Sequence, residues 1–119
     1  MTRLEKLTAR VQRAAAELDA TEFPPTTGPY FTLAGWSYDA TLAERIDLAT
    51  AIYFHGNAAM RGSRCFDNCF EMGDGRAVAR ELTRRARANP TLHERIAQDF
   101  GGTFPAQWTR EAEEPELAL

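Results

Sequence analysis

The spacing of apolar and polar positions predicts a chain built from helices. Between Leu4 and Leu18, apolar residues recur three and four positions apart, and charged residues occupy the other faces. Thr2 and Glu5 have the spacing of a capping box, which marks the start of a helix. We therefore expect a one-sided surface helix over residues 2–18.

The stretch from Thr41 to Met60 is apolar on most of its circumference. From Leu48 onward it contains no Asp, Glu, Lys or Arg. A helix of this kind belongs in the middle of a small protein, because each of its faces needs an apolar neighbour. Thr41 and Glu44 form a second capping box at its start. We predict one central helix over residues 41–60. Its predicted core residues are Ile46, Ile52 and Tyr53.

Residues 21–39 break the helical pattern and yet carry many large apolar side chains. The residues that disfavour a helix are Pro24, Pro25, Gly28 and Pro29. The large apolar residues are Phe23, Tyr30, Phe31, Leu33, Trp36 and Tyr38. We expect an ordered connection packed over the helices, with a short extended piece near Tyr30 to Leu33. Most of its aromatic residues should fill the core. The alternative is an aromatic surface that binds a partner or a ligand.

Two shorter helices are predicted in the second half of the chain. Asp74 is a candidate N-cap for a helix over residues 75–88, which Asn89 and Pro90 would end. Thr91 and Glu94 form a third capping box, which would open a helix that ends at Phe100. Between the central helix and these two, a short helical turn is expected from Cys65 to Phe70.

Together these elements predict an all-α fold, a single-domain bundle of about four helices over residues 1–108. A chain of 119 residues has the length of one domain. Residues 109–119 are rich in Glu and interrupted by Pro115, so we expect an acidic, flexible C-terminal tail.

Charge and cysteine content limit the expected surroundings. The net charge of −3 does not attract nucleic acid or an anionic membrane at long range. No apolar stretch has the roughly 18 or more residues of a membrane span, so no membrane partner is expected. Two cysteines do not make a disulfide framework, and the N-terminus is charged from Arg3 onward, unlike a signal peptide. We expect a cytoplasmic protein.

One candidate site for chemistry consists of His55, Cys65 and Cys69. Imidazole and thiolate are good ligands for zinc or copper, and two cysteines four positions apart share one face of a helix. A second pair of ligands is missing, however, so we expect two small buried cysteines and no cofactor. A metal or thiol-redox role for these three residues is the alternative, since Arg64 next to Cys65 would lower its pKa.

A row of arginines is the other candidate site. Arg76, Arg80, Arg84 and Arg87 fall within about 80° of one another at 100° per residue. Arg85 falls on another side of the helix, and Arg61 and Arg64 lie upstream. Guanidinium groups in a row suit phosphates or the acidic side chains of a partner. We therefore expect Arg80 and Arg84 to be exposed to solvent on one face of the helix. The alternative is a solvated face that balances the acidic tail.

The sequence contains none of the common catalytic or nucleotide-binding motifs. We therefore expect a non-enzymatic accessory or adaptor subunit that acts through a protein partner with an acidic surface. Binding of a nucleic-acid backbone by the arginine row is the alternative. A small metal or thiol-redox protein is a further alternative.

Overall fold

The computed structural model describes residues 1–23 and 25–98, which form seven helices and no strand. This arrangement confirms the all-α class. None of these described helices is both long enough and apolar enough to cross a membrane. The predicted end of the last helix at Phe100 and the tail over residues 109–119 lie outside the described residues. The helices are α1 (Arg3–Asp19), α2 (Pro29–Ser37), α3 (Leu42–His55), α4 (Ala58–Arg61), α5 (Arg64–Asn68), α6 (Gly75–Arg87) and α7 (Pro90–Gln98).

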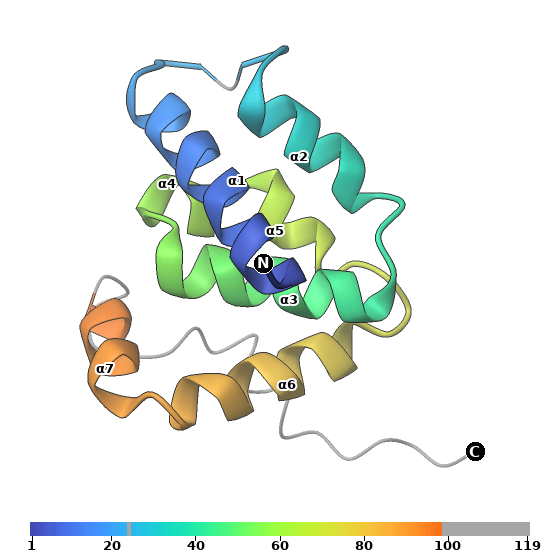
Figure 1. Cartoon of the computed structure of the whole chain (residues 1–119), viewed down its shortest axis with the longest axis vertical. Helices are drawn as coiled ribbons and strands as arrows, with labels where there is room; N and C mark the ends of the chain where they lie inside the picture. Colours follow the sequence, from blue (N-terminus) through green and yellow to red (C-terminus); the bar gives the residue numbers. More distant parts are fainter. Residues whose placement is uncertain (24, 99–119) are drawn as a thin grey trace.

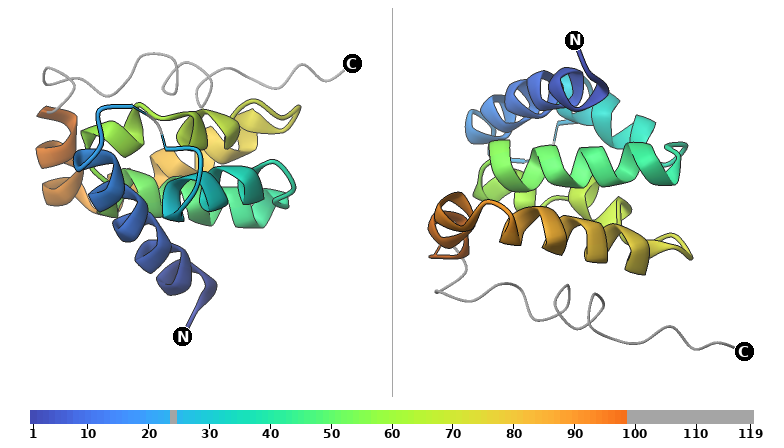
Figure 2. Two further views of the ribbon diagram at one scale, coloured as in Figure 1. Left: turned by 90° about the horizontal axis from the view of Figure 1, so that it is seen from above. Right: turned by 60° about the horizontal axis from the view of Figure 1, so that its bottom comes forward.

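Helix α3 lies at the centre of the fold and contacts α1, α4, α5, α6 and α7. On one side α1 crosses it with α2 alongside, and on the other side α6 runs along it (Figures 1 and 2). Ile52 and Tyr53 are fully buried, whereas Ile46 is half-buried against the core. The prediction is confirmed for the position of the helix and for two of its three core residues.

The predicted continuous helix over residues 41–60 is wrong at Gly56, where the backbone becomes extended. Asn57 then caps the short helix α4, because its Oδ1 accepts a hydrogen bond from the backbone N–H of Met60 at 2.9 Å. Its Nδ2 donates to a backbone carbonyl of α1 at 3.0 Å. These side-chain bonds favour a helix start over a helix interior. Met60 stays fully buried despite the break.

The predicted non-helical connection over residues 21–39 is also wrong, because Pro29 starts α2. Proline suits the first position of a helix, where its missing N–H leaves no bond unmade. Gly28 comes before it with a φ of 96°, a value that glycine adopts without strain. Glycine has no side chain that could cap the helix, and Glu17 of α1 takes this role by accepting the backbone N–H of Tyr30 at 2.9 Å.

The aromatic residues of this segment divide into two groups. Tyr30 is buried and Trp36 is partly buried against the core, as the core interpretation predicts. Phe23, Phe31 and Tyr38 are exposed. The expectation that most of these aromatics fill the core is therefore correct for only part of the set.

Helix α6 begins at the predicted place, but Asp74 makes no side-chain cap. Its carboxylate instead accepts two hydrogen bonds from buried Arg45, at 2.6 Å and 2.8 Å. This bidentate pair ties α3 to the start of α6 and holds the pKa of Asp74 below its ordinary value.

Helix α7 starts at Pro90, two residues before the Leu92 that an N-cap at Thr91 predicts. Pro90 occupies its first turn, so Thr91 and Glu94 do not form the predicted capping box. The reason is the same as at α2, since proline favours the first helical position more than it ends the preceding helix.

Candidate protein-interaction surface

The predicted arginine row lies on the side of α6 that faces away from the core. The opposite side of the helix is buried through Val78, Ala79 and Leu82. Arg84 and Arg87 are exposed, whereas Arg76 and Arg80 are half-buried. Arg84 thus has the exposure that the sequence predicts, and Arg80 is less exposed than expected.

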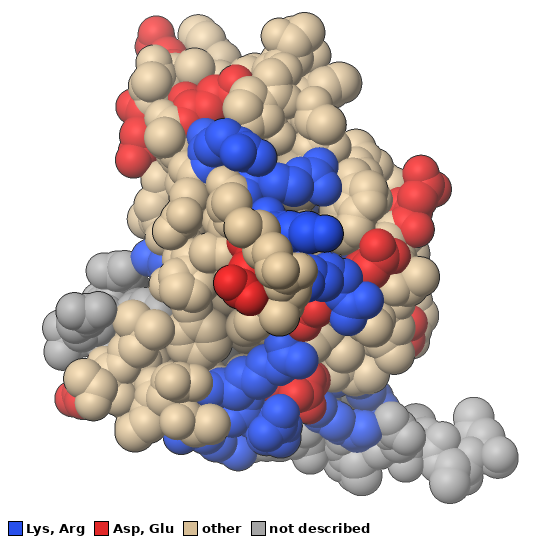
Figure 3. All heavy atoms as spheres, in the orientation of Figure 1, with Lys and Arg blue, Asp and Glu red and all other residues tan. Residues whose placement is uncertain are grey.

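Helix α1 carries a second row of basic residues, which was not identified from the sequence. Its members recur three and four positions apart and fall within about 80° at 100° per residue. This spacing is a signal that could have identified the row. Lys and Arg side chains gather over α1 and over α6 on the same face of the molecule (Figure 3). The members of the α1 row are Arg3, Lys6, Arg10 and Arg13.

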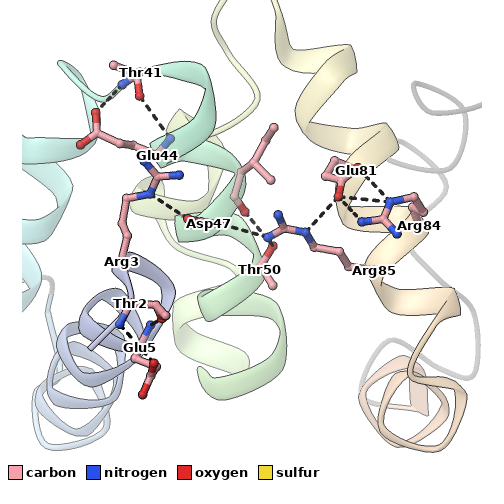
Figure 4. Close-up of polar contacts among 11 residues, drawn as sticks. Thr2, Arg3, Glu5, Thr41, Glu44, Asp47, Thr50, Glu81, Arg84 and Arg85 are labelled. Carbon is pink, nitrogen blue, oxygen red and sulfur yellow. Dashed lines mark hydrogen bonds and ion pairs between the residues drawn. The ribbon is translucent and has the colours of Figure 1, made fainter.

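Asp47 of α3 connects the two basic helices. Its Oδ2 accepts a hydrogen bond from Arg3 Nε of α1 at 2.8 Å, and its Oδ1 accepts one from Arg85 Nη1 of α6 at 3.0 Å (Figure 4). Arg85 Nη1 also donates to Thr50 Oγ1 at 3.0 Å. Arg85, which the sequence places outside the row, therefore joins α6 to the centre of the fold.

Glu81 of α6 extends this polar network toward the surface. It accepts hydrogen bonds from Arg84 Nε at 3.0 Å and from Arg85 Nε at 3.1 Å. These bonds lower the pKa of Glu81 to about 2, and the bond from Arg84 has the largest effect. Three guanidinium groups and two carboxylates share the network, so it carries a net charge of +1. Its members are Arg3, Asp47, Glu81, Arg84 and Arg85.

A hollow of about 420 Å³ opens beside the network, where α1, α3, α6 and α7 meet. Its apolar wall comes from Leu4, Phe54 and Leu92. Its polar wall comes from Asp47, Thr50, His55, Arg85 and Asn89. An apolar wall next to a few convergent polar groups is typical of a binding site. We call the hollow, the network and the exposed arginines of α6 the interaction surface.

The second predicted site is not assembled among residues 1–23 and 25–98. Cys65 and Cys69 are free thiols at full burial, whereas His55 is exposed at the rim of the hollow. Burial raises the pKa of the Cys65 thiol to about 12 and that of Cys69 well above its ordinary value, opposite to the expected effect of Arg64. Within these ranges no three residues of the types His, Cys, Asp and Glu come together as a metal site.

The two upstream arginines of the first predicted site lie elsewhere. Arg61 is buried, and its Nη1 donates to the backbone carbonyl of Tyr53 at 3.2 Å. Arg64 of α5 pairs with Glu71, which lies beyond the end of that helix, through two hydrogen bonds of 2.9 Å and 2.6 Å. Arg61 is therefore not available to a partner, and Arg64 belongs to another part of the surface.

The ionisation of Glu81 provides a test of the network. We expect carboxyl NMR to give a pKa of about 2 for Glu81, and Arg84→Gln to raise it toward the ordinary 4.5. Because the folded value lies below the ordinary one, the pairing stabilises the fold above about pH 4.5 and is lost as the pH falls through 2. The control Arg64→Gln removes another Arg–Glu pair and should leave Glu81 unchanged. An equal pKa of Glu81 in both variants would contradict the network.

Comparisons with known proteins find no relative of this chain. No protein-family model matches it, and neither curated proteins nor solved structures yield a match. The case for a function therefore depends on the chemistry of the interaction surface itself.

Proposed function

We propose that the protein is a non-enzymatic binding subunit that holds an acidic segment of a protein partner. The observation that supports this proposal is the apolar hollow of about 420 Å³ with Arg85 in its wall. A partner segment would place an aliphatic or aromatic side chain against Leu4, Phe54 and Leu92. Its neighbouring carboxylates would meet the arginines at the edge, in the usual arrangement of an apolar centre and a polar rim.

The arginines at the edge have the properties that such binding needs. The side chains of Arg84 and Arg3 are 68% and 50% exposed, so a partner can reach them without unfolding any helix. Guanidinium groups bind carboxylates through two parallel hydrogen bonds, and arginine is enriched among the residues that dominate binding energy at interfaces. An acidic partner would thus exchange some of the internal pairs for pairs across the interface.

Two features favour a protein partner over a nucleic-acid backbone. A phosphate backbone has no group that fills an apolar hollow. The net charge of −3 opposes a highly charged nucleic acid at long range. The carboxylates of Asp47 and Glu81 repel phosphates and an acidic segment alike. The basic residues over both α1 and α6 favour the second candidate, backbone binding, which would show a steep dependence on salt.

A random peptide library displayed on phage tests the proposal without knowledge of the partner. Selection on the immobilised protein should enrich peptides in which Asp or Glu flank an aliphatic or aromatic residue. Arg84→Glu should weaken binding of the selected peptides at least about tenfold. Arg64→Glu is the matched control, because it makes the same charge change at an arginine that also pairs with one glutamate. It should leave the peptide affinity unchanged.

The outcomes separate the candidate functions. Equal losses in the two variants would mean that net charge, not the interaction surface, governs binding. Enrichment of acidic peptides without an apolar residue would remove the role of the hollow. Tight binding of generic DNA or RNA, falling about 10³-fold or more between 50 and 200 mM salt, would favour nucleic acid instead. An Arg84→Glu variant that fails to fold would show that Arg84 is structural.

A further inference from the structure

A second, smaller hollow lies between α1 and the start of α2. It has a volume of about 180 Å³ and is lined by Arg10, Arg13, Pro29 and Thr32. We propose that this hollow binds a tetrahedral oxyanion of the phosphate class. The site is separate from the interaction surface, and the inference does not rest on the proposed function.

The two arginines bring positive charge to one place, and no carboxylate of the described residues forms an ion pair with them. Arg10 and Arg13 are one turn apart on α1, so their guanidinium groups repel each other. Among the described residues, neither arginine makes a hydrogen bond or an ion pair, and Arg10 Cζ lies 5.4 Å from the ring centroid of Trp36. An anion in the hollow would relieve this repulsion.

The start of α2 does not itself supply the site. Glu17 already accepts the backbone N–H of Tyr30 at 2.9 Å, so a carboxylate of the chain occupies that helix end. Glu17 is also drawn away from Arg13, which lies four residues before it on α1 and would otherwise be its natural partner. The attraction for an anion therefore comes from the two guanidinium side chains.

The donors in the hollow fit a phosphoryl group better than a carboxylate. Two arginines and a threonine line the space, and a tetrahedral group offers three or more oxygens that their guanidinium groups and hydroxyl could bind. The volume is below the roughly 300–1,000 Å³ of pockets for drug-sized ligands, so a single small group would bind here. Free inorganic phosphate and a phosphomonoester on a larger molecule share this chemistry.

Trp36 provides the readout for an experiment. In a Trp108→Phe background Trp36 is the remaining tryptophan of the two in the chain, and its emission should change when an anion draws Arg10 away from the ring. Inorganic phosphate is titrated at constant ionic strength, with chloride as the balancing anion. We expect saturable one-site binding, weakened at least about tenfold by Arg10→Gln with Arg13→Gln. The variant Lys6→Gln with Arg64→Gln removes the same charge elsewhere and should bind like the parent.

The remaining arms address the source of the anion and the folding of the variants. A short phosphoserine peptide that binds more tightly than inorganic phosphate would identify a phosphorylated macromolecule as the source, and equal or weaker binding would identify free phosphate. Shifts of the Arg10 and Arg13 Nε–H NMR signals in the parent give a readout that does not depend on a variant folding. Lack of saturation, unshifted arginine signals, or equal weakening in both double variants would overturn the proposal.

Discussion

Replacing Ile52 by alanine is expected to lower the free energy of unfolding by about 2–5 kcal/mol. Ile52 is fully buried on α3, the helix that contacts five others. Because neighbours on several sides hold their positions, the cavity left by the missing methyl and methylene groups cannot collapse completely. The lost transfer free energy and the cost of the cavity therefore add.

Urea denaturation measures this effect, and Leu42→Ala on the same helix is the control. Leu42 is 36% exposed, so its truncation should cost less than about 1 kcal/mol. An Ile52→Ala variant within about 0.5 kcal/mol of the parent would mean that α3 does not form the centre of the core.

The second large effect is expected at Gly75, where alanine should destabilise the protein by about 1–3 kcal/mol. A Cβ atom there would overlap the backbone oxygen of Phe70 and lie 2.9 Å from its carbonyl carbon. Backbone atoms cannot rotate aside as the end of a side chain can. The start of α6 would have to shift, which would disturb the pair of Arg45 and Asp74 that anchors it.

Gly73 provides the matched control two residues earlier. A Cβ there would meet no atom within 4 Å, so Gly73→Ala should change the free energy of unfolding by less than about 1 kcal/mol. The change should be a gain in stability, because alanine gives the unfolded chain fewer conformations than glycine. Thermal unfolding of the two variants side by side is the measurement. Equal melting temperatures would show that the chain adjusts around Gly75 without cost.

Helices with a clear period and a polar cap could be predicted from the sequence. The capping boxes at Thr2 and Thr41 form with both reciprocal hydrogen bonds (Figure 4). Helix α2 was missed because Pro29 has two opposite meanings, as a helix breaker and as a first helical residue. The cap that decides between them is Glu17, which belongs to another helix and leaves no local signal.

The candidate site could be predicted only where its residues share one helix. The α6 row has a regular spacing, but the bonds that hold the network together join Asp47 to residues 44 and 38 positions away. No local pattern encodes such pairs. The available hint was the presence of Arg45 and Asp47 on a helix otherwise predicted to be buried, since buried charges need partners. Both residues prove to be paired.

The sharing of one carboxylate by two helices makes Asp47 a point of competition. Arg3 and Arg85 both bind it, so each weakens the hold of the other through mutual repulsion. A partner that draws Arg85 away should leave Arg3 more firmly bound and the first turn of α1 less frayed. Thermodynamic reciprocity then requires that loss of Arg3 strengthens the pair of Asp47 and Arg85 and weakens binding of the partner. The N-terminal turn would thereby influence how readily Arg85 of α6 becomes available to a partner.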